Sequence, residues 1–170
     1  MAKTVELKRI VEKMNLKNLT PDVELNDKEV EVPDINRPAL QLSGYFEHFD
    51  SERVQIIGYV EYTFLEKLDM EKKKEVYKTL LSYKIPCIIF CRNLPPEQML
   101  LDMAVEADVP IFITEKKTSA FTAEIIRWMN VQLAPCISIH GVLVDVYGVG
   151  VLIMEIGRAS CRERVYRLVL

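Results

Sequence analysis

Two short, continuous apolar runs constrain the fold of this 170-residue chain more than any other feature. The runs "IPCIIF" at 85–90 and "VPIFIT" at 109–114 each contain a proline near the start and are otherwise rich in β-branched and aromatic residues, a composition typical of strands buried on both faces. The segment between them, 95–108, begins Pro-Pro-Glu and continues "QMLLDMAVEAD", which suits the first turn and the body of a helix. Strand, helix and strand at this spacing predict a β-α-β unit with parallel strands.

Similar patterns alternate along residues 1–134. A chain in which strands alternate with helices of this length forms an α/β fold, with a largely parallel sheet flanked by helices. We therefore predict a small N-terminal α/β domain over residues 1–134. The other predicted elements are a helix at 4–16 with Thr4 as N-cap, a strand at 53–59, a helical segment at 63–84 interrupted near Asp69, and a helix at 119–134 with Ser119 as N-cap.

The chain changes character at Pro135. Residues 136–154, "CISIHGVLVDVYGVGVLIM", are rich in β-branched residues and are punctuated by glycines, of which Gly148 and Gly150 are interpreted as turn residues. Two or three strands are predicted here, too few to bury a core by themselves. We interpret residues 135–154 as the start of a second domain, present as an incomplete β fragment.

Composition excludes several classes of protein. The formal net charge is -3, which does not indicate a nucleic-acid surface. Four arginines against two glutamates in residues 155–170 add two positive charges to the tail, so residues 1–154 carry a net charge of -5. No apolar run reaches the roughly 18 residues of a membrane helix, and the N-terminus has no secretory apolar region. We expect a cytoplasmic protein without a membrane partner.

Three of the four cysteines lie in or beside the apolar runs, at Cys87, Cys91 and Cys136. Their surroundings are typical of reduced thiols packed on strands. The spacing of Cys87 and Cys91 puts both sulfurs on one face of a strand but roughly 13 Å apart. We expect neither a disulfide nor a metal site from this pair.

Few other residues have the chemistry of a site. His140 could hydrogen-bond a phosphate or exchange a proton with it, although a histidine in a β run is also typical of a core or edge position. Asp145 could orient a neighbour, but strand alternation favours a structural role, and His48 is typical of a surface loop. The segment "EKKTS" at 115–119 is either an anion site at a helix N-terminus or a solvated turn and N-cap. The segment "EKKK" at 71–74 is interpreted as an exposed helix face.

Four stretches together resemble one protein family. They are "INRPALQLSGYF" (35–46), "PCIIFCRNLPPEQ", "ADVPIFITEKKTS" and "LAPCISIHGVLVDVYGVGVLIM". In this order they are similar to the HPr kinase/phosphorylase family of bacterial carbon-catabolite regulators. The first departs from the family pattern I-x-R-P-G-L-x-L-x-G-Y-F only at Ala39, and the pattern H-G-V-L-V-D-V-Y-G is matched throughout from His140 to Gly148. The resemblance covers residues 1–154.

The resemblance implies a function. Members of the family phosphorylate a serine of the phosphocarrier protein HPr with ATP or pyrophosphate, reverse the reaction with inorganic phosphate, require a divalent metal, usually magnesium, and assemble as homo-hexamers. By the same resemblance, 135–154 begins the C-terminal kinase domain and His140 is a catalytic residue. A P-loop should follow Met154, yet no G-x-x-x-x-G-K-[ST] occurs in these 170 residues. We therefore expect a truncated chain that binds no cofactor or metal and is inactive alone.

The tail has a separate interpretation. Residues 155–165, "EIGRASCRERV", resemble one reading frame of a common sequencing adapter, so we interpret 155–170 as a non-native tail; "YRLVL" at 166–170 is not explained in this way. The alternative is that the chain is a stand-alone regulatory or protein-binding α/β module. In that case the segments "NRPAL" and "EKKTS" are the candidate contact loops.

Overall fold

The computed structural model describes residues 3–153 and 165–169, with the side chains of 136–140 and 165–169 left undescribed. The chain divides into two compact units, Met1–Leu133 and Ala134–Leu170. Each unit is described by itself.

A five-stranded sheet organises the N-terminal unit, in the order β2-β7-β6-β5-β4. The four strands from β4 to β7 run parallel, and β2 joins the edge antiparallel to β7. The predicted β-α-β unit is confirmed, and so is the α/β fold class. The strands are β2 (Lys17–Asn18), β4 (Ile35–Asn36), β5 (Val54–Ile57), β6 (Ile88–Phe90) and β7 (Ile111–Ile113).

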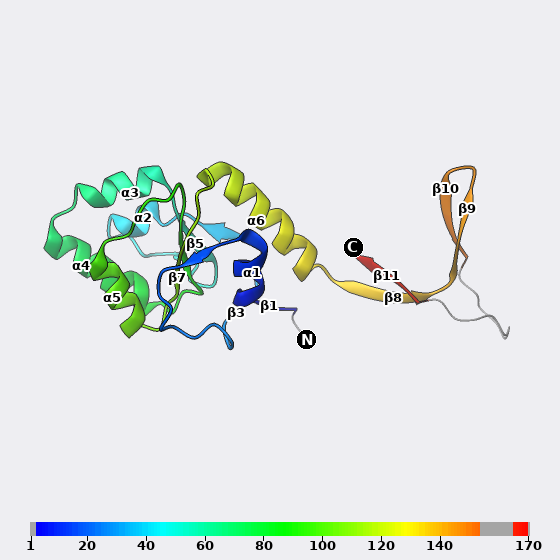
Figure 1. Ribbon diagram of the computed structural model, residues 1–170, viewed down its shortest axis with the longest axis horizontal. Coiled ribbons are helices and arrows are strands. Elements are labelled where there is room, and N and C mark those ends of the chain that lie inside the picture. Colours follow the sequence, from blue (N-terminus) through cyan, green and yellow to red (C-terminus); the bar gives the residue numbers. More distant parts are fainter. Residues whose placement is uncertain (1–2, 154–164, 170) are drawn as a thin grey trace. The chain divides into compact units, whose positions relative to one another are not determined.

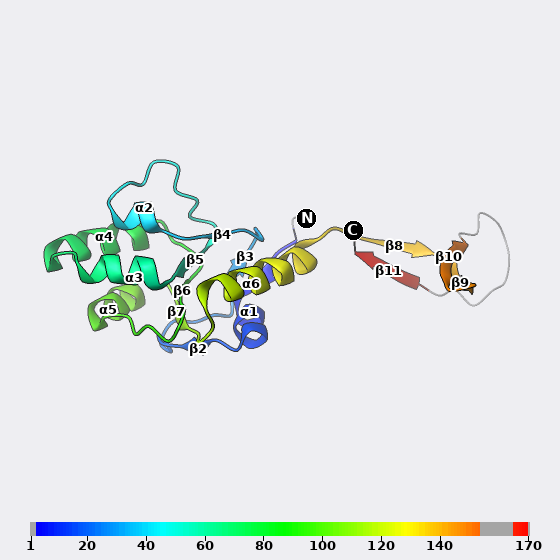
Figure 2. The ribbon, with the colours of Figure 1, turned by 90° about the horizontal axis from the view of Figure 1, so that it is seen from above.

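Helices cover both faces of this sheet (Figures 1 and 2). Successive strand residues point to opposite sides: Ile89 and Phe112 enter one core with α1 and α6, whereas Ile88 and Ile111 enter the other with α3, α4 and α5. Burial on both faces explains why β6 and β7 are continuously apolar in sequence. The helices are α1 (Leu7–Met14), α2 (Ala39–Leu42), α3 (Tyr59–Glu66), α4 (Met70–Ser82), α5 (Gln98–Glu106) and α6 (Thr118–Leu133).

Four predicted helix starts are wrong and one predicted interruption is right. The Pro-Pro-Glu segment precedes α5, which begins at Gln98, and α3 begins at Tyr59, four residues before the predicted start at Thr63. Thr4 does not cap α1, because the next two residues form strand β1 (Val5–Glu6), which pairs antiparallel with β3 (Glu29–Val30). Ser119 lies inside the first turn of α6, which begins one residue earlier. Asp69 takes the N-cap position of α4, where the helical segment was expected to break.

The second unit contains two antiparallel strand pairs. Strand β8 (Cys136–His140) pairs with β11 (Val165–Val169), and β9 (Val142–Val146) pairs with β10 (Val149–Ile153). The strand β11 falls within the segment interpreted as a non-native tail; residues 155–164 lie outside the described residues, so that interpretation stays a prediction.

The turn between β9 and β10 consists of Tyr147 and Gly148, which have φ angles of 54° and 81°. A two-residue turn with positive φ at both residues has a backbone twist that matches the right-handed twist of the two strands it joins. The Asp145 Oδ1 accepts a hydrogen bond of 2.7 Å from the Gly148 N–H. Gly148 is thus a turn residue as predicted, whereas Gly150 is not: it pairs with Asp145 inside the β9–β10 ladder.

One face of the β9–β10 hairpin is entirely apolar. The register places six β-branched side chains on it, each between 37% and 63% exposed, at Val142, Val144, Val146, Val149, Val151 and Ile153. A two-stranded hairpin of this kind is at best marginally stable in water without further cover. We refer to these six residues as the hairpin face.

Candidate functional site

The carboxyl ends of the parallel strands are where an α/β sheet usually places its site. In this unit, Arg37 follows β4, Gly58 follows β5, Cys91 follows β6 and Thr114 follows β7. These four positions and the residues next to them form the carboxyl edge. Its polar side chains decide whether this edge can accept a ligand.

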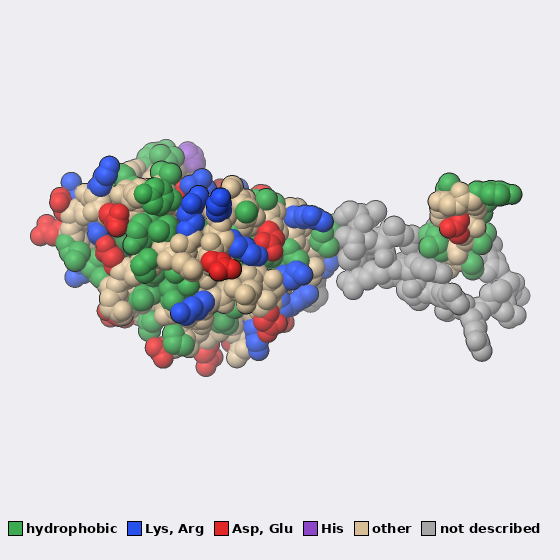
Figure 3. Space-filling view, turned by 45° about the horizontal axis from the view of Figure 1, so that its top comes forward, with side chains coloured by type: hydrophobic (Ala, Val, Ile, Leu, Met, Phe, Trp, Pro, Cys, Tyr) green, Lys and Arg blue, Asp and Glu red, His purple; other side chains and the backbone are tan. Residues whose placement is uncertain are grey.

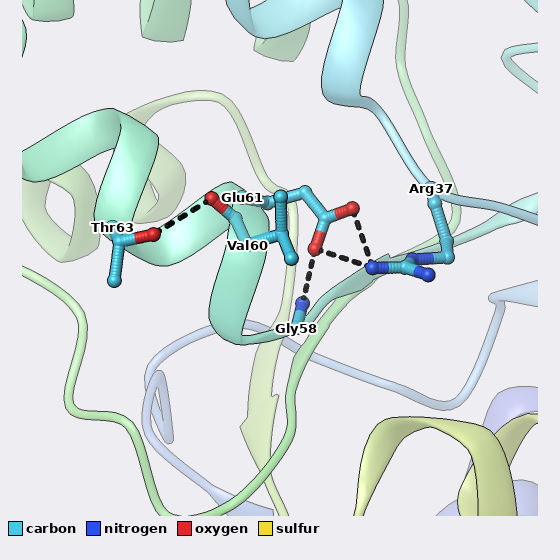
Figure 4. Close-up of polar contacts among 5 residues, drawn as sticks. All are labelled: Arg37, Gly58, Val60, Glu61 and Thr63. Atoms are coloured by element: carbon cyan, nitrogen blue, oxygen red, sulfur yellow. Dashed lines mark hydrogen bonds and ion pairs between the residues drawn. The ribbon is translucent and has the colours of Figure 1, made fainter.

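A buried carboxylate occupies the start of α3 (Figure 4). Glu61 is 3% exposed, and its Oε2 accepts a hydrogen bond of 3.0 Å from the Gly58 N–H. The same carboxylate binds Arg37, whose Nη2 lies 2.8 Å from Oε1 and 2.9 Å from Oε2. A glutamate three residues into a helix that turns back to the first free N–H forms half of a capping box. The positive end of α3 is therefore already matched by a carboxylate of its own chain.

Gly58 allows α3 and α6 to begin close together. A Cβ at this position would lie 2.7 Å from the Thr118 Oγ1 and 3.1 Å from the Glu61 Oε2. A side chain here would displace one of these groups. The close approach fills the space beside the end of β5 with protein atoms.

Both described cysteines are free and buried, as the sequence predicted. Burial raises the pKa of the Cys87 thiol well above its usual range. Burial also raises the pKa of Cys91 to about 11, although a hydrogen bond with Thr118 and the nearby Arg37 and Arg92 lower it. The thiolate is the reactive form of cysteine, so these two thiols are unsuited to nucleophilic chemistry at neutral pH.

The loops after β6 and β7 close on each other. The Arg92 N–H donates to the Lys116 carbonyl over 3.0 Å, and the Asn93 N–H donates to the Thr114 carbonyl over 2.9 Å. The Lys116 ammonium in turn lies 2.7 Å from the Glu124 carboxylate. One of the two lysines in segment 115–119 thus forms an ion pair within the chain. The backbones of the two loops are thus hydrogen-bonded to each other at the carboxyl edge.

A second ion pair corrects the interpretation of the "EKKK" segment at Lys73, whereas Glu71, Lys72 and Lys74 are exposed as predicted. Lys73 is buried and pairs with Glu97, which precedes α5. Burial raises the pKa of the neighbouring Tyr77, and the negative charge of Glu97 raises it further. The other Glu97 oxygen, Oε2, is buried without a hydrogen-bond partner. The face of α4 that carries Lys73 is therefore a packed connection to α5.

The two histidines singled out from the sequence belong to different units of the chain. His140 lies in β8, but its side chain is outside the described residues. His48 is an exposed loop residue with a φ angle of 61°, as expected. Among the residues that the structure describes, no three His, Cys, Asp or Glu side chains lie close enough together to hold a metal ion. Sequence reasoning missed Glu61, although the G-x-x-E pattern directly after an apolar strand was a usable signal.

None of the helices in the described part of the chain is long and apolar enough to span a membrane. A solved structure with partial likeness contains the CBS and DRTGG domains of the regulatory region of Clostridium perfringens pyrophosphatase. That chain has a TM-score of 0.47 and 12% identity, over 71% of this chain and 46% of its own.

Comparison with known sequences gives a consistent result. The family described as HPr Serine kinase N terminus matches residues 5–129. The HPr kinase/phosphorylase of Lachnoclostridium phytofermentans is 55% identical over 151 residues, which cover 89% of this chain and 49% of the relative. That of Alkaliphilus metalliredigens is 38% identical over 151 residues, 89% of this chain and 48% of the relative. The chain spans about half the length of these curated relatives, and it belongs to the HPr kinase/phosphorylase family.

Proposed function

We propose that this chain is the N-terminal part of a bifunctional HPr serine kinase/phosphorylase. The whole enzyme would phosphorylate a serine of HPr with ATP or pyrophosphate and remove the phosphate by phosphorolysis, in carbon catabolite repression. The observation that carries the proposal is the 55% identity with an HPr kinase/phosphorylase over 151 residues. The accompanying expectations are a cytoplasmic homo-hexamer whose protein partner is HPr, with no nucleic-acid or membrane partner.

The geometry supports a non-catalytic role for the N-terminal unit within that enzyme. Phosphoryl transfer depends on positioned phosphates and a metal ion, and the described residues lack a cluster that fits magnesium. The sequence also has no P-loop pattern, and the carboxyl edge is filled by Glu61, Thr118 and two hydrogen-bonded loops. We infer that the N-terminal unit is non-catalytic and that the 170-residue chain alone neither binds ATP or magnesium nor turns over.

His140 is the residue of this chain to which we assign a chemical role. In the whole enzyme its imidazole would hydrogen-bond the transferred phosphate or exchange a proton with it. That role needs phosphate bound beside it by groups of the kinase domain, so His140 by itself does no chemistry.

A chimera tests this proposal. Residues 1–153 would be joined to the C-terminal half of the Lachnoclostridium phytofermentans relative, and transfer of labelled phosphate from ATP to HPr would be measured. We expect transfer by the chimera, none by the 170-residue chain, and a large loss in the chimera carrying His140→Ala. The matched control is His48→Ala, the only other histidine of the chain, which should keep full activity. The proposal would be contradicted by a well-folded chimera that transfers no phosphate to HPr. It would also be contradicted if His140→Ala left the transfer rate of the chimera unchanged.

One observation favours the alternative, a stand-alone protein-binding module. Leu40 in the "NRPAL" segment is 62% exposed, and Val60 in the adjacent helix α3 is 66% exposed. Exposed apolar residues of this kind are typical of contact surfaces when they are contiguous. Resequencing the gene across the Met154 codon separates the two functions. A frame that continues into G-x-x-x-x-G-K-S supports the kinase, and a stop codon after Leu170 supports the module.

A further inference from the structure

The surface of the N-terminal unit has a groove formed by α6 and one residue of α1. Its volume of about 460 Å³ lies within the range of natural binding sites. Its lining consists of Lys13, Ala123, Glu124, Arg127, Trp128 and Val131. We call it the α1–α6 groove.

The floor of the groove combines apolar surface with a rigid aromatic ring. Trp128, the only tryptophan of the chain, packs against the core between α6 and the sheet and also lines the groove. Val131, three residues further along α6, is 51% exposed. An anchored tryptophan beside exposed apolar surface is typical of the residues that dominate protein interfaces.

Two of the three charged side chains at the groove are positive and unpaired. Lys13 and Arg127 have no ion pair or side-chain hydrogen bond among the described residues. The one acidic group of the lining, Glu124, is matched by Lys116 at 2.7 Å. Figure 3 shows several Lys and Arg side chains, with some Asp and Glu among them, on the half of the unit that α1 and α6 form. This local charge is opposite to the net charge of -5 on residues 1–154, so it is not a general property of the surface.

We propose that the α1–α6 groove binds an acidic peptide segment of a partner protein. An apolar side chain of the segment packs on Trp128 and Val131, while flanking carboxylates pair with Lys13 and Arg127. Charge complementarity of this kind selects the partner and steers its approach. Two free cations on an otherwise acidic protein are too few for a nucleic-acid backbone. The inference goes beyond the kinase function and does not depend on it.

The test uses the full chain and a displayed library of short random peptides. Selection on the unmodified protein, with Arg127→Glu as counter-selection, should enrich peptides that carry Asp or Glu around a Leu, Ile, Phe or Met. A resynthesised peptide without tryptophan should change the fluorescence of Trp128 in a saturable way. We expect its dissociation constant to rise about tenfold or more in Arg127→Glu and in Lys13→Glu. The matched control is Lys78→Glu, an exposed lysine of α4 outside the lining, which should bind as the unmodified protein does.

Several results would overturn the inference. They are a selection that enriches nothing, enriched peptides without acidic residues, and equal binding by Arg127→Glu and the unmodified protein. Self-association of the full chain that Arg127→Glu abolishes would also overturn it, because the occupant would then be a second copy. Circular dichroism of each variant shows that the fold is intact. The readout needs neither ATP nor HPr, so its failure leaves the kinase proposal standing.

Discussion

The central sheet of the N-terminal unit and the β9–β10 hairpin have similar sequences and opposite environments. The sheet strands β6 and β7 are buried on both faces by helices, and even the polar Gln55 within β5 is fully buried. Its side-chain oxygen accepts a hydrogen bond of 2.8 Å from Asn36 and its nitrogen donates over 2.7 Å to the Arg53 carbonyl. The hairpin face has six β-branched residues without comparable burial.

This difference shows when an apolar strand stabilises the folded chain. Burial of apolar area contributes roughly 25 cal/mol per Å², and a strand gains it only where another element covers its face. In the N-terminal unit the intervening helices supply that cover from within residues 3–133. The described residues of the second unit include no helix. Its apolar side chains therefore add little to the stability of the chain as described.

The largest effect is expected when one apolar side chain in each region is replaced by alanine. Phe112→Ala removes a fully buried ring from the middle of the sheet and should lower the free energy of unfolding by about 3 to 5 kcal/mol. Leu143→Ala removes an exposed side chain from the hairpin and should change it by less than about 0.5 kcal/mol. Urea unfolding followed by the fluorescence of Trp128 measures both. Similar costs for the two variants would show that the hairpin is covered.

The next effect concerns the buried carboxylate of the carboxyl edge. Glu61→Ala should cost about 2 kcal/mol, because it removes the acceptor of the Gly58 N–H and of the partly exposed Arg37. Glu61→Gln keeps an acceptor oxygen and should cost less. The control is Glu66→Ala, an exposed glutamate of the same helix. If the two alanine variants unfold at the same urea concentration, the Glu61 pair does not hold α3 in place.

The sequence predicts the elements well because their signals are local. The continuous apolar runs are sufficient for the two strands of the β-α-β unit, since burial on two faces leaves no polar position in β6 or β7. The helix between them was also predicted, but it begins at Gln98, after the Pro-Pro-Glu segment. Thr4 failed as a cap because pairing of Val5–Glu6 with Glu29–Val30 overrides the local capping preference. This pairing joins residues that are far apart in sequence.

The polar clusters were missed for the same reason. Glu61 and Arg37 are 24 residues apart, as are Lys73 and Glu97. A lysine in "EKKK" is indistinguishable from its solvated neighbours until the fold brings a carboxylate to it. Internal ion pairs therefore require the tertiary structure, whereas strands and helices do not.

A smaller effect depends on pH and on the buried thiol of the same unit. The pKa of Cys91 is raised from 9.0 to about 11, mainly by burial. The folded protein therefore holds this proton more tightly than the unfolded chain, so the stabilisation is complete below pH 9 and is lost as the pH rises toward 11. The free energy of unfolding should fall over that interval, and less steeply in Cys91→Ala. Parallel slopes for the two proteins would contradict the assignment.

Substitutions on the hairpin face are expected to change the free energy of unfolding least. Their main effect should be on dye binding and self-association. Val144 and Val151 are cross-strand partners on it, and replacing both with threonine keeps the β-branched shape while adding two hydroxyl groups. Because these side chains are exposed, unfolding of the N-terminal unit should not change, whereas binding of a hydrophobic dye and self-association should decrease. Leu143→Thr on the opposite face is the matched control and should have the weaker effect, because only Leu152 there is a second large apolar residue. A loss of unfolding free energy in the double variant would mean that the hairpin face is covered in solution, and the contrast between the two regions would then fail.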